Sequence, residues 1–331
     1  MPPQHAKSPC CRDRIVRFGK RRRQCKRCKK TWSIRPKKRG RPAKLAPTGL
    51  LDAVFRQGYT LRYLARRSSS LAAPTFRHRF RQALRRFVTR PRKLKAPRGQ
   101  LILLLDGIRF QFAGRPWVLY QRALKSCHGR TAVFLDPVLL EGLEGAWKWE
   151  GLISKIPVRT RSRIRGIVVD NTRGMDKLAQ RHGWVLQLCQ FHLIMKLQVP
   201  PRWQRRALKG GSVRFEIYRL VRKALDAPEG PELKCTLAKL TELLKSPCGT
   251  RRVKMMIREF LRAVEFYRAW RTHPHLGIPA TTNTVESMNS IVRDMFRRNR
   301  SASSPRALQL WATALVRHRS RIVCNGKKST D

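Results

Sequence analysis

The feature that most limits the fold of this chain is an apolar run that leads into an acid. Five aliphatic residues, Leu101 to Leu105, are followed directly by Asp106 and Gly107. A short run that is apolar at every position is typical of a strand buried on both faces. A carboxylate at the end of such a strand is costly to bury unless a cation meets it. The run therefore predicts a central strand that ends in an acid.

A second stretch repeats this pattern further along the chain. Ile167 and the two valines after it lead into Asp170. Two buried strands that each present an aspartate suggest a shared metal site. The alternative is that each aspartate only caps the element that follows its strand. These residues alone leave both interpretations open.

The charge of the chain indicates its partner. It has 75 Lys+Arg against 19 Asp+Glu, a formal net charge of +56. Such an excess attracts polyanions, and nucleic acid is the default partner. No run approaches the roughly 18 apolar residues of a membrane-spanning helix, and the N-terminus lacks the apolar core of a signal peptide. Nine unevenly spaced cysteines do not fit a secreted disulfide framework. We therefore expect a cytosolic protein that handles DNA or RNA.

Residues 1–45 are basic and resemble a zinc ribbon followed by a linker. Structural zinc takes four ligands, so the Cys-x-x-Cys pair at 25–28 needs partners. Ser8 stands where a cysteine would complete a second such pair with Cys11. Either the segment binds zinc or it is a degenerate ribbon without metal, and both hypotheses stay open. The candidate zinc ligands are Cys11 (or Cys10), Cys25, Cys28 and His5.

Residues 46–95 have the pattern of a helix-turn-helix domain. Apolar stripes at helical spacing predict three short helices, with breaks at Gly58 and before Pro74. The third helix carries basic side chains opposite its apolar face, which suits the DNA duplex. An ordinary basic helical bundle is the alternative. The candidate DNA contacts on this helix are Arg77, Arg79 and Arg81.

The remainder of the chain predicts an α/β fold of the ribonuclease H type. Residues 98–199 read as three early antiparallel strands, a crossover helix and two later strands. Residues 200–280 carry apolar side chains at helical spacing and form an all-helical insertion. Residues 281–320 resume the core with a final helix, and residues 321–331 form a tail.

Two further groups of polar residues belong to this core. Cys189 and His192 follow the last strand, and their spacing fits half a metal site or a local structural pair; the structural role is favoured. Glu286 lies beside the buried stripe of the final helix. It is a candidate metal ligand, although Asn283 and Glu286 also have the spacing of a capping box. Arg293 and Arg297 share its face and are candidate DNA contacts.

Four features of the chain, taken together, resemble the DDE transposases. They are the strand that leads to Asp106 and, after it, the motifs VVDNTRGM (168–175), CQFH (189–192) and TTNTVESMNSIVR (281–293). The group they resemble most is the bacterial insertion-sequence enzymes related to the Mutator-like elements. The basic ribbon and helix-turn-helix are similar to the DNA-binding front end of such enzymes. The resemblance covers nearly the whole chain.

The resemblance implies a specific function. Asp106, Asp170 and Glu286 would be the catalytic triad and would bind Mg²⁺ or Mn²⁺, and Cys189 with His192 would be the Cys-x-x-His signature. The implied partners are double-stranded DNA, both element ends and target, and further copies of the chain in a homodimer or higher oligomer. The implied location is the bacterial nucleoid. Two alternatives are a non-catalytic DNA-binding protein derived from a transposase and a ribonuclease H-like nuclease without strand transfer.

Overall fold

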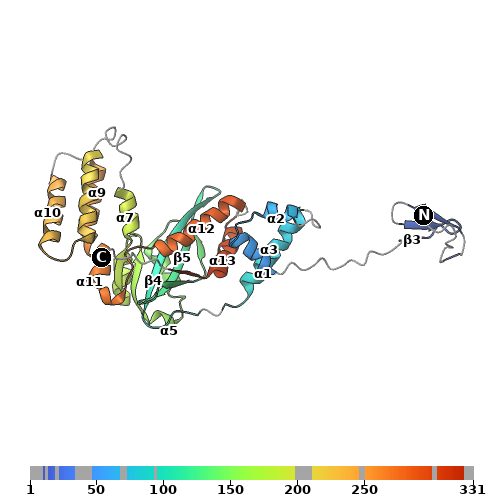
Figure 1. Cartoon of the computed structure of the whole chain (residues 1–331), viewed down its shortest axis with the longest axis horizontal. Helices are drawn as coiled ribbons and strands as arrows, with labels where there is room; N and C mark the ends of the chain where they lie inside the picture. The colour runs from blue at the N-terminus through green and yellow to red at the C-terminus, as the bar shows by residue number, and fades with distance from the viewer. Residues whose placement is uncertain are drawn as a thin grey trace.

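The computed structural model describes residues 10–11, 14–18, 22–33, 47–67, 73–92, 95–197, 211–245, 250–299 and 304–323. In this part of the chain a mixed seven-stranded sheet forms the centre of the fold (Figure 1). The strand order is β10-β6-β5-β4-β8-β9, and β7 pairs with β5. The strands are β4 (Leu101–Phe112), β5 (Arg115–Ser126), β6 (Thr131–Phe134), β7 (Val138–Glu141), β8 (Ile164–Val169), β9 (Val185–Leu188) and β10 (Arg321–Val323).

The expectation that the first strand ends at Asp106 is wrong. β4 continues to Phe112 and forms a long hairpin with β5, in which Asp106 pairs with Gln121. Apolar residues at every second position after Asp106 keep one side of the strand packed, and the turn occurs at Ala113–Gly114, where φ is 49° and 74°. What ends near Asp106 is the parallel pairing of β4 with β8, which extends as far as Leu104 and Val168.

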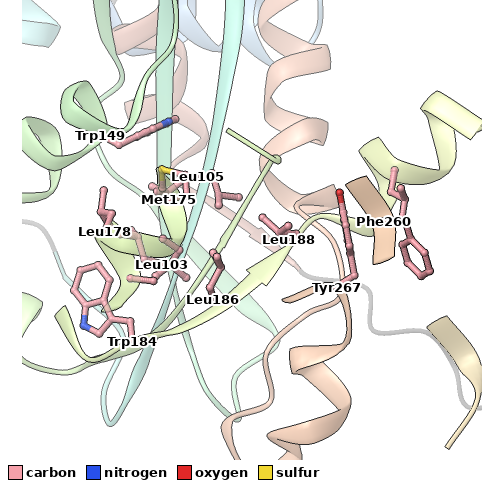
Figure 2. Packing of buried hydrophobic residues seen from close by; sticks show 14 of the residues in the cluster. Leu103, Leu105, Trp149, Met175, Leu178, Trp184, Leu186, Leu188, Phe260 and Tyr267 are labelled. Atoms are coloured by element: carbon pink, nitrogen blue, oxygen red, sulfur yellow. The ribbon is translucent and has the colours of Figure 1, made fainter. Parts of the chain in front are cut away.

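Helices cover both faces of β4, which explains its uninterrupted apolar run. Leu101, Leu103 and Leu105 pack in one cluster with residues of α4 (Ala146–Ile153) and α6 (Met175–His182). Figure 2 shows Leu103 and Leu105 in this cluster together with Trp149 and Leu178. The residues between them, Ile102 and Leu104, pack in the opposite cluster with α12 (Asn283–Asn299). Asp106 continues this second series, because side chains alternate along a strand.

In the part that the structure describes, the stretch predicted as a helical insertion contains the helices α9, α10 and α11. They lie at one end of the molecule, and α11 contacts the edge strand β9 (Figure 1). The short helix α5 (Val158–Arg161) precedes β8, and α7 (Gln190–Leu197) follows β9. Within the described residues, no helix combines the length and apolarity needed to cross a membrane. The three insertion helices are α9 (Gly211–Asp226), α10 (Pro231–Lys245) and α11 (Arg251–Thr272).

The helices before the sheet are α1 (Pro47–Phe55), α2 (Leu61–Arg67) and α3 (Ala73–Thr89). The first and third of these helices pack on α13 (Pro305–Arg319), where Phe55 and Phe80 contact the ring of Trp311 at centroid distances of 6.1 and 5.1 Å, and α2 packs on α3. Sequence reasoning predicted only one helix in 281–320 and a tail after it. The structure instead adds α13, whose buried side chains include Leu308 and Leu315, and the strand β10, which pairs with β6.

The N-terminal segment forms a small antiparallel sheet. Its strands are β1 (Ile15–Phe18), β2 (Arg22–Cys25) and β3 (Thr31–Ser33), in the order β1-β2-β3. The Cys-x-x-Cys pair begins at the last residue of β2 and ends in the turn before β3, where Lys29 has a positive φ of 61°. His5, Ser8 and the basic linker predicted at 35–43 lie outside the described residues.

Candidate functional site

The parallel pairing of β8 and β9 places Asp170 beside Cys189. The two strands pair as far as Val169 and Leu188, and the Cys189 N–H then donates to the Val169 carbonyl at 2.8 Å. The next residues on both strands therefore leave the same end of the sheet together. The helix α7 begins at once, and the Nδ1 atom of His192 in its first turn lies 3.8 Å from Asp170 Oδ1.

Cys189 also holds the start of α12. Its sulfur accepts hydrogen bonds from the N–H and the hydroxyl of Thr282, at 3.3 and 3.1 Å. These contacts bring Glu286, in the first turn of α12, to the same place. Its Oε1 atom lies 3.6 Å from His192 Nδ1, 3.7 Å from the Cys189 sulfur and 3.0 Å from the Thr282 hydroxyl. The favoured structural role of the Cys-x-x-His pair is thus consistent with these contacts.

The alternative that Glu286 completes a capping box is not realised. The N–H of Asn283 donates to the Thr281 hydroxyl at 3.4 Å, so it is not the partner of the Glu286 carboxylate. The backbone N–H groups of Val285 and Glu286 donate to the Thr282 carbonyl at 2.7 and 3.0 Å. The Glu286 carboxylate is therefore directed toward Thr282, Cys189 and His192 and not used for local capping.

Asp106 contacts the same helix, α12, one turn beyond Glu286. Asn289 lies three residues after Glu286 and so shares its side of α12. Its Nδ2 atom donates to Asp106 Oδ2 at 2.7 Å, and both residues are buried, at 0% and 7% exposure. Burial raises the pKa of Asp106 to about 7, with Glu286 acting in the same direction and His192 opposing it. The structure thus brings Asp170 and Glu286 to His192, and places Asp106 at the next turn of α12 through Asn289.

The charge of His192 balances part of this acidic cluster. Its hydrogen bond with Cys189 raises its pKa to about 9, and the negative charges of Asp170 and Asp106 add to this, while burial opposes it. The imidazole is therefore protonated at neutral pH. Burial also raises the pKa of Glu286, which the charge of His192 partly offsets. Without a bound metal, His192 supplies positive charge between Asp170 and Glu286.

Two overlapping sets of donors at this site suit different metals. The ligand atoms of Cys189, His192 and Glu286 all lie within 4.8 Å of one another, and sulfur, nitrogen and oxygen donors fit zinc. The carboxylates of Asp106, Asp170 and Glu286 are hard oxygen donors that fit Mg²⁺ or Mn²⁺. Glu286 belongs to both sets. The sulfur of Cys189 already accepts two hydrogen bonds from Thr282, which favours the oxygen set.

Sequence reasoning missed a further acid at this site, Glu144. It lies between β7 and α4, and its Oε1 atom accepts a hydrogen bond from Trp149 Nε1 at 3.0 Å. Burial raises its pKa, and the charge of Asp170 adds to this effect. A connecting segment has no periodic pattern that would mark such a residue. The one signal in the sequence was the scarcity of acids in a chain with only 19 of them.

The N-terminal cysteines form a separate cluster. The sulfur atoms of Cys10, Cys11, Cys25 and Cys28 lie within 4.8 Å of one another. The cluster contains the predicted ligands Cys11, Cys25 and Cys28. It also contains Cys10, which was the alternative to Cys11. The hydrogen bond with Cys28 raises the pKa of Cys11 to about 12, and burial and the neighbouring sulfurs add to it. Four sulfurs at this spacing fit tetrahedral zinc, which keeps thiolates deprotonated.

The arginines predicted to contact DNA are all exposed. Arg77, Arg79 and Arg81 lie on α3, and Arg293 and Arg297 lie on α12. Arg297 is partly neutralised, because its Nη2 atom lies 2.9 Å from Asp294 Oδ1. The structure leaves these side chains accessible to a polyanion without placing one there.

Comparisons with known proteins give little similarity. No protein-family model matches the chain, and no curated protein sequence matches it. Among solved structures, a Drosophila P element transposase strand transfer complex is 9% identical, with a TM-score of 0.32, over 80% of this chain and 95% of that chain. NurA with manganese is 15% identical, with a TM-score of 0.13, over 71% of this chain and 58% of that chain. Similarity at this level establishes neither a shared fold nor a shared function.

Proposed function

We propose that this protein is a DNA transposase that cuts DNA at the ends of its element and joins those ends to a target. The observation that carries the proposal is the convergence of three acids that are far apart in the sequence: Asp170 and Glu286 lie at one histidine, and Asp106 accepts a hydrogen bond from Asn289, one helical turn after Glu286. The sheet supports it: three antiparallel strands, β6-β5-β4, are followed by the parallel strands β8 and β9, which is the arrangement expected of a ribonuclease H-like core.

The carboxylates would hold two Mg²⁺ or Mn²⁺ ions, which activate an attacking water or 3′-hydroxyl and stabilise the leaving oxygen. The role of the protein's own residues is then to bind the metal ions and to orient them and the DNA. β4 and β8 hold Asp106 and Asp170 on adjacent strands of a buried sheet. Cys189 fixes the position of α12, and with it Glu286, through the two hydrogen bonds from Thr282. The positive charge of His192 would hold Asp170 and Glu286 near each other when no metal is bound.

DNA binding would come from the basic front end and from α12. The helices α1–α3 would act as a helix-turn-helix, with Arg77, Arg79 and Arg81 of α3 toward the duplex. Arg293 and Arg297 would contact DNA close to the carboxylates, because they lie on the same helix as Glu286. The cysteine cluster would hold a structural zinc ion, and a homodimer or higher oligomer would pair the two element ends.

The proposal is tested with the full-length protein, labelled DNA carrying the element ends, and Mg²⁺. Asp106→Asn and Glu286→Gln should each lower cleavage and joining by at least about a hundredfold. Glu141→Gln is the matched control, since Glu141 is exposed and pairs only with Arg115 in the described part of the chain. DNA binding without cleavage by the wild type would support the non-catalytic alternative. Cleavage without joining would support the nuclease.

A further inference from the structure

Gln121 is a buried amide that lies directly opposite Asp106 in the β4–β5 hairpin. The two residues are partners in the antiparallel register, so their side chains leave the sheet on the same face, with Cβ atoms about 5 Å apart. The register pairs on either side of them on this face are apolar: Leu104 with Ala123 and Ile108 with Leu119. This is the face that α12 covers. Gln121 therefore lies beside Asp106 on the next strand, while Asn289 contacts Asp106 from the helix.

The amide of Gln121 uses neither its donor nor its acceptor within the described part of the chain. The residue is 0% exposed, and neither its Nε2 nor its Oε1 atom has a hydrogen-bond partner there. Gln187 on β9, which is equally buried, shows the ordinary arrangement. Its Nε2 atom donates to the Leu188 and Tyr267 carbonyls, and its Oε1 atom accepts from the Trp270 N–H. Buried polar groups are nearly always paired, so the unpaired amide of Gln121 points to a role other than packing.

The second amide next to Asp106 is only half used. Asn289 is also fully buried, and its Nδ2 atom donates to Asp106 Oδ2 at 2.7 Å. Its Oδ1 atom has no hydrogen-bond partner among the residues that the structure describes. Asp106 and the two amides thus form one buried polar group with three unpaired atoms, inside the apolar cluster between the sheet and α12. A half-paired polar group is less stable than an apolar core, so packing does not account for it.

We infer that Gln121 is a positioning residue for the proposed divalent cation: its Nε2–H group donates to the ionised Asp106 carboxylate and, together with Asn289, holds it in the orientation that binds the ion. An ionised carboxylate has about four lone-pair sites, so it can accept from both amides and still bind a metal. Carboxylates that bind metals are themselves hydrogen-bonded, and these partners orient them and tune the affinity for the ion. The inference rests on the proposed function, because Gln121 acts on the ion only through Asp106.

The test is Gln121→Met in the full-length, DNA-free protein. Methionine is unbranched and fills a core position, but it has no amide, so it removes the hydrogen-bond donor and leaves the space filled. Mn²⁺ binding, measured by electron paramagnetic resonance of the free ion, should weaken by at least about tenfold. Gln111→Met makes the same exchange at an exposed position of β4 and should bind Mn²⁺ as the wild type does. Wild-type binding by Gln121→Met would overturn the inference.

Thermal unfolding in EDTA separates positioning from packing. Because the amide of Gln121 is unpaired, Gln121→Met should unfold at the wild-type temperature or higher. Weakened Mn²⁺ binding together with a lowered unfolding temperature would be a structural effect and would overturn the inference. Gln121→Asn keeps an amide in the core but draws it back by one methylene, and it should also weaken Mn²⁺ binding. Full Mn²⁺ affinity in Gln121→Asn would overturn the inference even if Gln121→Met does not fold.

A further variant distinguishes failure of the inference from failure of the proposed site. If the wild type binds no Mn²⁺, or if Asp106→Asn binds it as the wild type does, the proposed metal site fails and the inference fails with it. If Asp106→Asn weakens binding and Gln121→Met does not, only the inference fails. Weakened binding in both variants, with Gln111→Met unchanged, is the result expected.

Discussion

Burial gives Asp106 a charge state different from the one it would have in water. Its pKa is raised by burial from 3.8 to about 7, and its side chain is held by Asn289. A folded-state pKa above the unfolded-state value means that the folded protein binds the proton more tightly. The free energy of unfolding therefore falls as the pH rises from about 4 to about 7. A divalent cation would offset this destabilisation by pairing with the carboxylate.

The variant Asp106→Asn tests this directly. In EDTA, it should unfold at a higher temperature than the wild type at pH 8, and the gain should be smaller at pH 5, where the wild-type carboxyl is protonated. The gain at pH 8 should be on the order of a few kcal/mol. Mg²⁺ should stabilise the wild type more than the variant. A stability difference that stays constant between pH 5 and pH 8 would contradict the assigned cause, because a change in packing alone is independent of titration.

Asp136 joins three elements that are distant in the sequence. It follows β6, and its carboxylate accepts hydrogen bonds from Arg317 of α13 at 2.6–3.1 Å and from Arg92, after α3, at 3.1 Å. Arg317 also donates to the Arg90 carbonyl at 2.9 Å. Burial alone would raise the pKa of Asp136, but the two arginines outweigh it and the pKa is lowered. This ion cluster therefore helps attach the front helices to the sheet.

Replacing Asp136 should loosen this attachment. Asp136→Asn should lower the free energy of unfolding by about 2 kcal/mol at pH 7, as expected when charged hydrogen bonds are removed. Because the folded-state pKa is depressed, the stabilisation is present above the unfolded-state pKa and is lost as the pH falls through the folded-state value. Urea unfolding at pH 7 and at about pH 3 measures both effects. Asp176→Asn, at an exposed position on α6, should change stability by about 0.5 kcal/mol or less. Equal penalties for the two variants would contradict the structural role of Asp136.

The cysteine cluster makes a prediction for the N-terminal sheet. Cys25→Ser removes one sulfur of the four and should reduce the zinc content of the purified protein from one ion per chain to nearly none, since a structural site needs all four ligands. Cys235→Ser, at an exposed cysteine of α10 outside the cluster, is the control and should retain the metal. Mass spectrometry of the metals measures both. Unchanged zinc in Cys25→Ser would mean that this residue holds no metal.

Elements with a strong local pattern could be predicted from the sequence, and those set by distant partners could not. The runs at 101–105 and 167–169 indicated central strands because both faces of the sheet are covered. The position of Glu286 followed from the apolar stripe of α12. The extension of β4 past Asp106 depends on its pairing with β5, which single-strand patterns do not show. Glu144 depends on Trp149, and β10 on β6, so neither had a local signal.

The whole molecule combines two opposite electrostatic features. Its formal net charge of +56 produces a field that attracts the phosphates of DNA. The carboxylates at the proposed site lie within this basic chain, where they attract metal ions instead. Figure 1 shows the insertion helices α9–α11 at one end of the sheet, with α12 and then α3 toward the other end. DNA bound along α3 and α12 would therefore reach the carboxylates without crossing the insertion helices.

Arg77 and Arg81 are one helical turn apart on α3 and share a side of that helix. If they bind DNA phosphates, Arg77→Ala combined with Arg81→Ala should reduce the slope of log affinity against log salt by roughly one for each arginine that binds a phosphate. Arg219→Ala with Arg222→Ala removes the same charge from exposed positions on α9 and is the matched control. Fluorescence anisotropy between about 50 and 200 mM salt measures the slopes. Equal slopes for the two double variants would mean that the charge of the whole chain, and not the face of α3, determines DNA binding. A smaller slope for the α3 variant alone would locate the phosphate-binding side chains on that helix.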